Sequence, residues 1–171
     1  LIRREIDHAQ AGRGGHIRAK INSLVDPAII ALLYEASQAG VTIELVVRGM
    51  CSLRPALEGI SDGITVISVI GRFLEHSRIF CFGNGGEAEL FIGSADWMSR
   101  NLDRRVEAVA QIEDPRLRHQ LEQILDLYLQ DTGAWHMNSE GQFHKRQHGG
   151  EQHLVQQEMV KRWRGGLIAA T

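Results

Sequence analysis

Regular alternation of apolar and polar residues predicts a β-strand early in the chain. In segment 16–22, three apolar residues alternate with basic ones, which is the period of a strand with one polar face. The preceding segment, 2–11, has apolar residues at helical spacing and ends at Gly-Arg-Gly-Gly 12–15. The pattern therefore predicts a helix followed by a strand.

A second helix and two buried strands are predicted next. Asp26 and Pro27 are typical of a helix start, and Gly40 is placed to end that helix. The short β-branched runs 41–47 and 64–70 favour strands buried on both faces. Such strands belong to a sheet that is covered by helices.

The middle of the chain predicts a hairpin, a further strand and a long helix. Strands 78–82 and 88–92 flank a Gly-Asn-Gly-Gly turn, and segment 105–112 alternates again. Pro115 begins a helix with an apolar stripe. Beyond this helix the pattern weakens, although segment 151–164 fits a last amphipathic helix. The predicted fold class is α/β, with a mixed β-sheet flanked by helices.

Composition and charge narrow the partner classes. A chain of 171 residues with 43% hydrophobic content can build one core. With 19 basic and 21 acidic side chains the net charge is −2, so a polyanion needs a local basic cluster, and a histone-like or membrane-coating protein is not indicated. The sequence has neither an apolar run of about 18 residues nor a signal peptide. We therefore expect a cytoplasmic protein without a membrane span, with peripheral association with the inner membrane as an alternative.

Cysteine and histidine spacings predict no metal site. Cys51 and Cys81 are far apart and form no Cys-x-x-Cys motif, which indicates neither a disulfide framework nor a zinc site. Several histidines in the second half suggest a metal, but their spacings match no zinc signature, and scattered exposed histidines are the favoured interpretation. These are His119, His136, His144, His148 and His153.

One stretch combines the residue types that phosphoryl transfer requires. His76 and Arg78 are two residues apart, so on a strand their imidazole and guanidinium point to the same face. The turn Gly-Ser-Ala-Asp at 93–96 offers small residues that let the backbone approach a phosphate. The alternative interpretation is a solvated strand end followed by an ordinary turn.

This stretch resembles the signature of the phospholipase D superfamily, in which His-x-Lys is followed by Gly-Ser-x-Asn. Three positions depart from that signature: Arg78 replaces the lysine, Gly83 stands where an aspartate is expected, and Asp96 replaces the asparagine. Arginine keeps the charge but changes the donor geometry, and the missing aspartate removes an orienting partner. The departures count against a diesterase of this superfamily.

Four ordered segments are similar to one family within that superfamily, the C-terminal catalytic domain of bacterial polyphosphate kinase of the long-chain-synthesising type. The similarity covers residues 2–135 and implies a phospholipase-D-like domain at 1–148, followed by a C-terminal helix or tail at 149–171. The segments that carry it are LVDPAIIALLYEASQAGV (24–41), LVVRGMCSLRP (45–55), GITVISVIGRFLEHSRIF (63–80) and GSADWMSRNLDRRVE (93–107).

The resemblance implies reversible transfer of the terminal phosphate of ATP to polyphosphate, with Mg²⁺ as cofactor. It also implies a phosphohistidine in a preceding domain, upstream of Leu1. The implied partners are ATP or ADP, polyphosphate, that preceding domain and further copies in a homo-oligomer, without nucleic acid. A phospholipase-D-like phosphodiesterase or nuclease and a non-catalytic polyanion-binding module remain alternatives, and the 171 residues alone are expected to fold but to be inactive.

Three candidate site residues come from the resemblance. His76 matches the active-site histidine that lies against the nucleotide phosphates, and Arg48 matches a nucleotide-contacting arginine. Arg105 is similar to a further arginine that lines the path of the phosphate chain. A strand-end histidine, a loop arginine and a solvated strand face are the respective alternatives.

Three more candidates come from the predicted geometry. Arg78 and Lys20 occupy polar positions of predicted strands, and Ser94 lies in the small-residue turn. Each position could face the same cleft and bind ATP or phosphate. The alternative for the two cations is a solvated strand face, and Ser94 could serve only to shape the turn.

Overall fold

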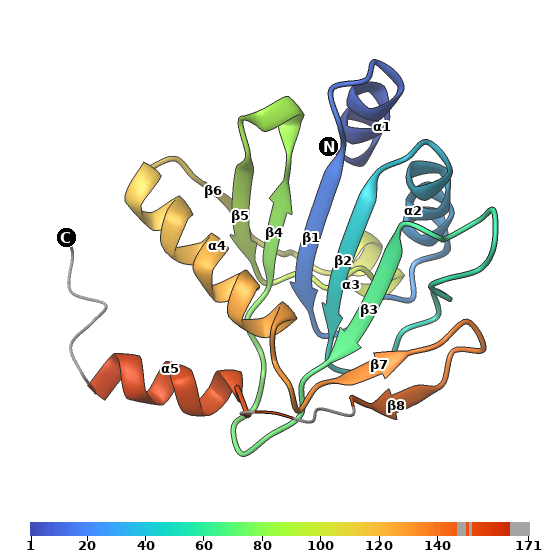
Figure 1. Ribbon diagram of the computed structural model, residues 1–171. Coiled ribbons are helices and arrows are strands. Elements are labelled where there is room, and N and C mark those ends of the chain that lie inside the picture. The colour runs from blue at the N-terminus through green and yellow to red at the C-terminus, as the bar shows by residue number, and fades with distance from the viewer. Residues whose placement is uncertain (147–149, 151, 165–171) are drawn as a thin grey trace.

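The computed structural model describes residues 1–146, 150 and 152–164. Helices and strands succeed one another along the whole of this part (Figure 1). In chain order the elements are α1 (Ile2–Gln10), β1 (His16–Ile21), α2 (Pro27–Gln38), β2 (Thr42–Val47), β3 (Ile64–Ser68), β4 (Ile79–Phe82), the 3₁₀ turn η1 (Asn84–Gly86), β5 (Glu89–Gly93), α3 (Ser99–Arg104), β6 (Val109–Ile112), α4 (Pro115–Leu129), β7 (Trp135–Met137), β8 (Phe143–Lys145) and α5 (Val155–Arg164).

The strands of the described residues form one mixed sheet, as the sequence predicts. Its eight strands have the order β6-β5-β4-β1-β2-β3-β7-β8. The central strands β1, β2 and β3 are parallel, whereas β4 runs antiparallel to β1 and continues into the antiparallel strands β5 and β6. The carboxyl ends of the parallel strands therefore lie beside the start of β4, at the lower end of the sheet in Figure 1.

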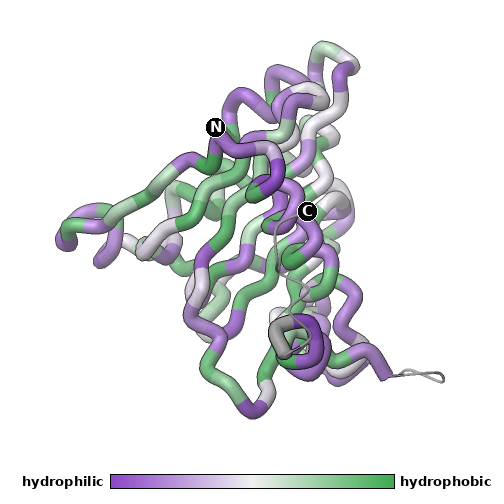
Figure 2. Tube along the Cα trace, turned by 90° about the vertical axis from the view of Figure 1, so that its left-hand side faces the viewer, coloured by the Kyte–Doolittle hydropathy of each residue, from purple (hydrophilic) through white to green (hydrophobic). Residues whose placement is uncertain are grey.

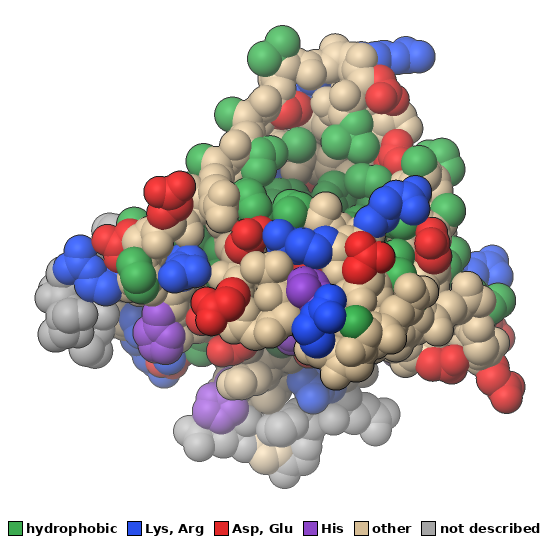
Figure 3. Space-filling view, turned by 90° about the horizontal axis from the view of Figure 1, so that it is seen from above, with side chains coloured by type: hydrophobic (Ala, Val, Ile, Leu, Met, Phe, Trp, Pro, Cys, Tyr) green, Lys and Arg blue, Asp and Glu red, His purple; other side chains and the backbone are tan. Residues whose placement is uncertain are grey.

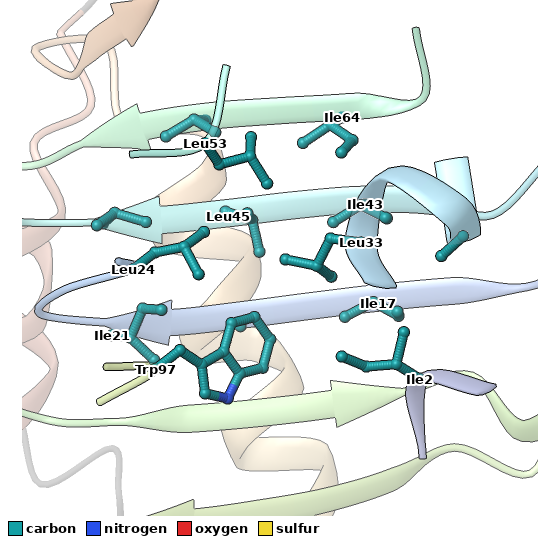
Figure 4. Close-up of a cluster of buried hydrophobic side chains, with 14 of the residues drawn as sticks. Ile2, Ile17, Ile21, Leu24, Leu33, Ile43, Leu45, Leu53, Ile64 and Trp97 are labelled. Carbon is teal, nitrogen blue, oxygen red and sulfur yellow. The ribbon is translucent and has the colours of Figure 1, made fainter. Parts of the chain in front are cut away.

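Helices cover both faces of the sheet because its strands alternate between two apolar cores. Ile17 of β1 and Ile43 of β2 lie in the larger core, beneath Leu33 of α2 (Figure 4). The opposite face buries Val46 of β2 against Tyr128 of α4 and residues of α5. Figure 2 shows apolar strands between more hydrophilic outer segments. The period-two pattern thus produces three layers, with helices on each side of the sheet.

Capping residues start two helices where the sequence predicts them. The carboxylate of Asp26 accepts hydrogen bonds from the backbone N–H groups of Ala28 (3.1 Å) and Ile29 (3.0 Å) at the first turn of α2. Asp114 accepts one from Arg116 N (2.8 Å) at the start of α4. Each cap is followed by a proline whose missing N–H needs no partner at that position.

The structure corrects several predicted elements. The strand predicted at 105–112 begins only at Val109, because α3 and an extended segment precede it. The hairpin β7–β8 occupies the part whose pattern was weakest, and its strands of three residues are too short to show a period. On the polar face of β1, Arg18 donates to Asp126 of α4 (2.6 Å) and Lys20 is buried, whereas the His16 side chain is 43% exposed.

The described residues include the two cysteines, most of the histidines and all the helices named above. Cys51 and Cys81 are both free. The part of the chain that the structure describes holds no group of three or more metal-ligating side chains; His148 lies outside the described residues. No helix in the described segments is long and apolar enough to span a bilayer.

The end of the sheet opposite to the carboxyl ends of the parallel strands carries interspersed side chains of both charges, as the view from above shows (Figure 3).

Candidate functional site

The candidate site lies where the carboxyl ends of β1 and β2 meet the start of β4. Lys20 pairs with Ile79 across β1 and β4, and Ile79 pairs with Ile92 near the end of β5. The chain segments that carry His76, Arg48 and the turn 93–96 are therefore brought to one edge. A ligand-facing group at the carboxyl end of a strand is expected in open α/β sheets.

His76 lies in the segment that leads into β4 rather than on a strand. The strand begins at Ile79, so the strand geometry expected for His76 and Arg78 is wrong. The two side chains nevertheless meet: Arg78 Nη1 donates to the backbone oxygen of His76 (2.8 Å) and lies 3.1 Å from its Nδ1. The same Nη1 lies 3.4 Å from Nε2 of the ring, so the guanidinium lies against the imidazole and near both of its nitrogens.

Asp96 joins the turn 93–96 to both β1 and Arg78. Its buried carboxylate accepts from the backbone N–H of Asn22 (2.7 Å) and from Arg78 Nη2 (2.9 Å). Arginine and aspartate are two of the departures from the phospholipase D signature, and they form a charge-assisted pair with each other. The two changes are complementary because the carboxylate fixes the plane of the guanidinium.

Arg48 directly follows β2 and is half-buried. Its Nε donates to Asn22 Oδ1 (3.1 Å), while Nδ2 of Asn22 is buried without a hydrogen-bond partner among the described residues. Gly49 allows this close approach, since a Cβ there would lie 2.8 Å from the Asn22 backbone oxygen. Arg48 and segment 69–75 line a cavity of about 430 Å³.

Ser94 and Arg105 meet at a carboxylate, Glu107. The Ser94 hydroxyl donates to Glu107 and accepts from Ala108 N (3.0 Å), and Arg105 Nε lies 3.5 Å from the same carboxylate. Hydrogen bonds from Ser94 and then Asn101 lower the pKa of Glu107 below its usual value, and the charges of Arg105 and Arg78 act in the same direction. Arg105 follows α3, and its side chain is 55% exposed.

Lys20 is the candidate that lies deepest. Its side chain is 2% exposed, and Nζ lies 3.2 Å from Glu75 Oε2 and 2.9 Å from Ser77 Oγ. Burial lowers the pKa of Lys20, Glu75 opposes that shift, and the charges of Arg48 and Arg78 add to it. The ammonium therefore lies behind the His76 segment, and phosphate binding by Lys20 stays a prediction.

Four residues of this network were not among the sequence-based candidates. Asp96 was noted only as a departure from a motif, and Asn22 carried the signal of a polar residue directly after a strand. Glu75 adjoins His76 in sequence. Tyr128 had no sequence signal for a site, because its position in the apolar stripe of α4 indicated only core packing.

Comparison with known proteins assigns this chain to a family. The family model described as Polyphosphate kinase C-terminal domain 2 matches residues 1–157. The chain belongs to the polyphosphate kinase C-terminal domain 2 family. The predicted resemblance is thereby confirmed, and the matched range includes all six candidate residues.

Relatives of the polyphosphate kinase family match nearly the whole chain. A protein of Parasynechococcus marenigrum (strain WH8102) named polyphosphate kinase is 63% identical over 170 residues, which is 98% of this chain and 24% of the relative. The crystal structure of polyphosphate kinase from Porphyromonas gingivalis superposes with a TM-score of 0.91 at 39% identity, covering 96% of this chain and 26% of that one. The chain thus spans about a quarter of the length of these relatives.

The polyphosphate kinase domain shares its fold with a phospholipase D family member, as predicted. The crystal structure of Nuc from Salmonella typhimurium superposes with a TM-score of 0.53 at 15% identity, covering 82% of this chain and 88% of that one. At this identity the likeness concerns the fold alone. The predicted α/β, phospholipase-D-like fold class is confirmed.

Proposed function

We propose that the protein containing this chain is an ATP:polyphosphate phosphotransferase, which reversibly moves the terminal phosphate of ATP onto a polyphosphate chain. Membership of the family and the names of the relatives support this proposal. The observation that carries it is the arrangement at the strand ends. There Arg78 contacts His76, and Arg48 lines a cavity together with segment 69–75, which leads directly to His76, in a chain whose net charge is −2.

The donors at the site suit phosphate oxygens. Arg48 keeps its guanidinium at the cavity, and the unpaired Nδ2 of Asn22 lies beside it in the described structure. Guanidinium groups bind phosphate through paired N–H donors, and a buried donor without a partner is costly unless a ligand accepts from it. We assign Arg48 to the nucleotide phosphates, and Arg105, with Ser94 beside it, to the polyphosphate chain.

His76 acts at the phosphate that is transferred. Its ring is exposed at the edge, and Arg78 fixes the ring from one side. Three roles suit it: proton donor, proton acceptor, or stabiliser of charge on the transferring group. Arg78 acts with it, because its guanidinium is held by Asp96 and is poised beside the imidazole.

The phosphohistidine implied by the resemblance belongs, in this proposal, to a part of the protein outside this chain. In the first step the bond from the γ-phosphorus to the bridging oxygen breaks, ADP leaves with the electron pair, and a histidine nitrogen bonds to phosphorus. In the second step a terminal oxygen of polyphosphate attacks phosphorus, and the histidine nitrogen leaves. This chain supplies the cations that surround the moving phosphate.

Magnesium enters the proposal as a partner of the ATP phosphates. Mg²⁺ is usually bound through one or two carboxylates together with substrate phosphates, and it neutralises developing charge. The residues that the structure describes include no group of three or more metal ligands. In this proposal Mg²⁺ is therefore bound mainly by the nucleotide phosphates and not by this chain alone.

Other parts of the proposal concern the whole protein. We propose that the phospholipase-D-like domain spans 1–148 and that the C-terminal segment 149–171 supplies α5, which packs against the core of that domain. Assembly as a homo-oligomer and a cytoplasmic location complete the proposal. Light scattering of the full-length protein and cell fractionation would test these two points.

A direct assay of the full-length protein separates the proposed function from its rivals. With ATP, Mg²⁺ and a polyphosphate primer, we expect ADP release together with longer polyphosphate. Hydrolysis of bis(p-nitrophenyl) phosphate without ATP would instead indicate a diesterase. Polyphosphate binding without ADP release or diester hydrolysis would indicate a polyanion-binding module.

A further inference from the structure

A buried carboxylate next to His76 connects three separate elements. Glu75 Oε2 accepts a hydrogen bond from the Tyr128 hydroxyl of α4 (2.6 Å) and lies 3.2 Å from Lys20 Nζ of β1. Its other oxygen, Oε1, accepts from Gln156 Nε2 of α5 (2.7 Å). The residue immediately before the exposed His76 is therefore fixed from a strand and from two helices.

The residue after His76 is held by the same ammonium. Lys20 Nζ donates to the Ser77 hydroxyl (2.9 Å) and lies 3.3 Å from the Ser77 backbone oxygen. The ammonium also lies 4.8 Å from the centroid of the Tyr128 ring. Both neighbours of His76 are thus tied to one buried charge, while the imidazole between them stays exposed.

Gln156 holds the start of this segment as well. Its amide oxygen accepts from Phe73 N (3.0 Å), and its amide nitrogen donates to Phe73 O (2.9 Å). The side chain thereby pairs with the backbone much as a neighbouring strand would. Helix α5 reaches the site edge through Gln156, which lies inside the range matched by the family model.

Stability alone does not account for this cluster. Removing two charges from water costs several kcal/mol per ion, and a well-packed apolar pair is often about as stable as a buried ion pair. What a hydrogen-bonded ion pair adds is a fixed geometry, because each donor and acceptor has a preferred direction. The cluster stands directly behind the residues that we assign to the phosphates.

We propose that Lys20, Glu75, Tyr128 and Gln156 are positioning residues that hold the segment 73–78, so that His76 and Arg78 face the transferring phosphate. In this assignment Lys20 is a positioning residue in place of the phosphate-binding role predicted from the sequence, and none of the four touches substrate. Helix α5 becomes part of the catalytic apparatus through Gln156. The inference rests on the proposed function and deepens it, since a displacement of about 1 Å can cost 10²-fold in rate.

Two mild variants of the full-length protein test the cluster. Tyr128→Phe removes one hydroxyl, and Gln156→Ala removes the contacts to Phe73 and Glu75. Matched controls lie elsewhere: Tyr34→Phe removes a hydroxyl that accepts from Arg54 N, and Gln38→Ala removes a donor to the backbone oxygen of Gly59. The readouts are kcat, KM for ATP, and amide hydrogen exchange of segment 73–78.

We expect kcat to fall about 10- to 100-fold in both test variants, while KM for ATP stays within about threefold. Exchange of segment 73–78 should become at least about tenfold faster, with β1–β3 unchanged, because local opening no longer breaks these contacts. The controls should match the wild type in all three readouts.

Unchanged exchange in both test variants would overturn the inference, and so would unchanged kcat despite faster exchange. A fall in kcat that the controls share would also overturn it, because the effect would then be a general loss of stability. The proposed function fails separately, through a wild-type protein that transfers no phosphate. The exchange measurement needs no activity and would still decide whether the cluster holds the segment.

Discussion

Arg78 donates to the backbone oxygen of His76 and places the same nitrogen, Nη1, 3.1 Å from the imidazole Nδ1. The backbone contact fixes where the guanidinium lies, and Nη1 also lies 3.4 Å from Nε2, so the guanidinium packs against the imidazole ring. A lysine at this position would offer a point charge on a flexible stem, whereas the arginine presents a rigid fork to the ring and to Asp96. The site therefore presents the histidine in a defined orientation.

Replacing His76 by alanine should abolish most ATP-dependent polyphosphate synthesis by the full-length protein. General acid–base groups contribute typically 10²–10⁴-fold, so a loss in that range is expected. His119→Ala is the matched control, since His119 is exposed on α4 and bonds Gln123. Synthesis within about twofold of wild type would contradict the assignment, because removing a proton-transfer group should cause a far larger decrease.

Replacing Arg48 by alanine should make nucleotide binding by the full-length protein less sensitive to salt. Each cation that neutralises a phosphate releases a counterion, so by analogy with nucleic acids the slope of log affinity against log salt should fall by about one unit. Titrations at several salt concentrations measure the slope. Arg116→Ala is the control, because Arg116 is exposed and pairs with Asp114. An Arg48→Ala protein with the wild-type slope and unchanged nucleotide binding would refute the role of Arg48.

Lys20 and Glu75 should show strong energetic coupling. Glu75→Gln leaves the ammonium buried without its counter-charge and should lower the free energy of unfolding by about 3–5 kcal/mol. Adding Lys20→Met removes the unpaired charge and should restore stability to within about 1 kcal/mol of wild type. Chemical denaturation of the 171-residue chain, which we expect to fold alone, measures both. Additive losses would show that the two groups do not form a pair in solution.

Ser94→Ala should raise the pKa of Glu107 towards its usual value of 4.5, because the hydroxyl is the main cause of the lowered pKa. A carboxylate with a lowered folded pKa stabilises the fold above its unfolded pKa and loses that contribution as pH falls through the folded value. Below pH 4.5 the variant should therefore lose less stability per pH unit than wild type. NMR titration of the Glu107 carboxyl checks the shift. Ser99→Ala is the control: the Ser99 hydroxyl donates to Asp26, so its removal should leave the Glu107 pKa unchanged.

The sequence predicts most of the fold because its strongest signals are local. The alternation in 16–22, the Asp-Pro start at 26, the start at Pro115 and the apolar runs each correspond to an observed element. It does not predict β7 and β8, which are held by pairing: β7 pairs with β3, and β8 pairs with β7. Nor does it reveal that α4 covers the polar face of β1, since that depends on residues more than 100 positions apart.

The candidate site could be predicted only as a set of residue types. The spacing of His76 and Arg78 indicated their proximity, although a strand was the wrong reason for it. The position of Lys20 behind the site follows from Glu75 and Tyr128, and no local pattern links a strand residue to a helix residue 108 positions later. The missing information is tertiary pairing of polar groups, which composition and period do not encode.

The contacts around Glu75 can form only in a certain order during protein synthesis. Protein synthesis releases Lys20 first, then Glu75, then Tyr128, and Gln156 last. The strands β1–β4 can pair before α5 has left the ribosome. Until Gln156 emerges, however, the backbone N–H and C=O of Phe73 and the Oε1 atom of Glu75 still bond to water. A newly made chain therefore acquires its sheet early, and its His76 segment becomes ordered only after α5 has been synthesised.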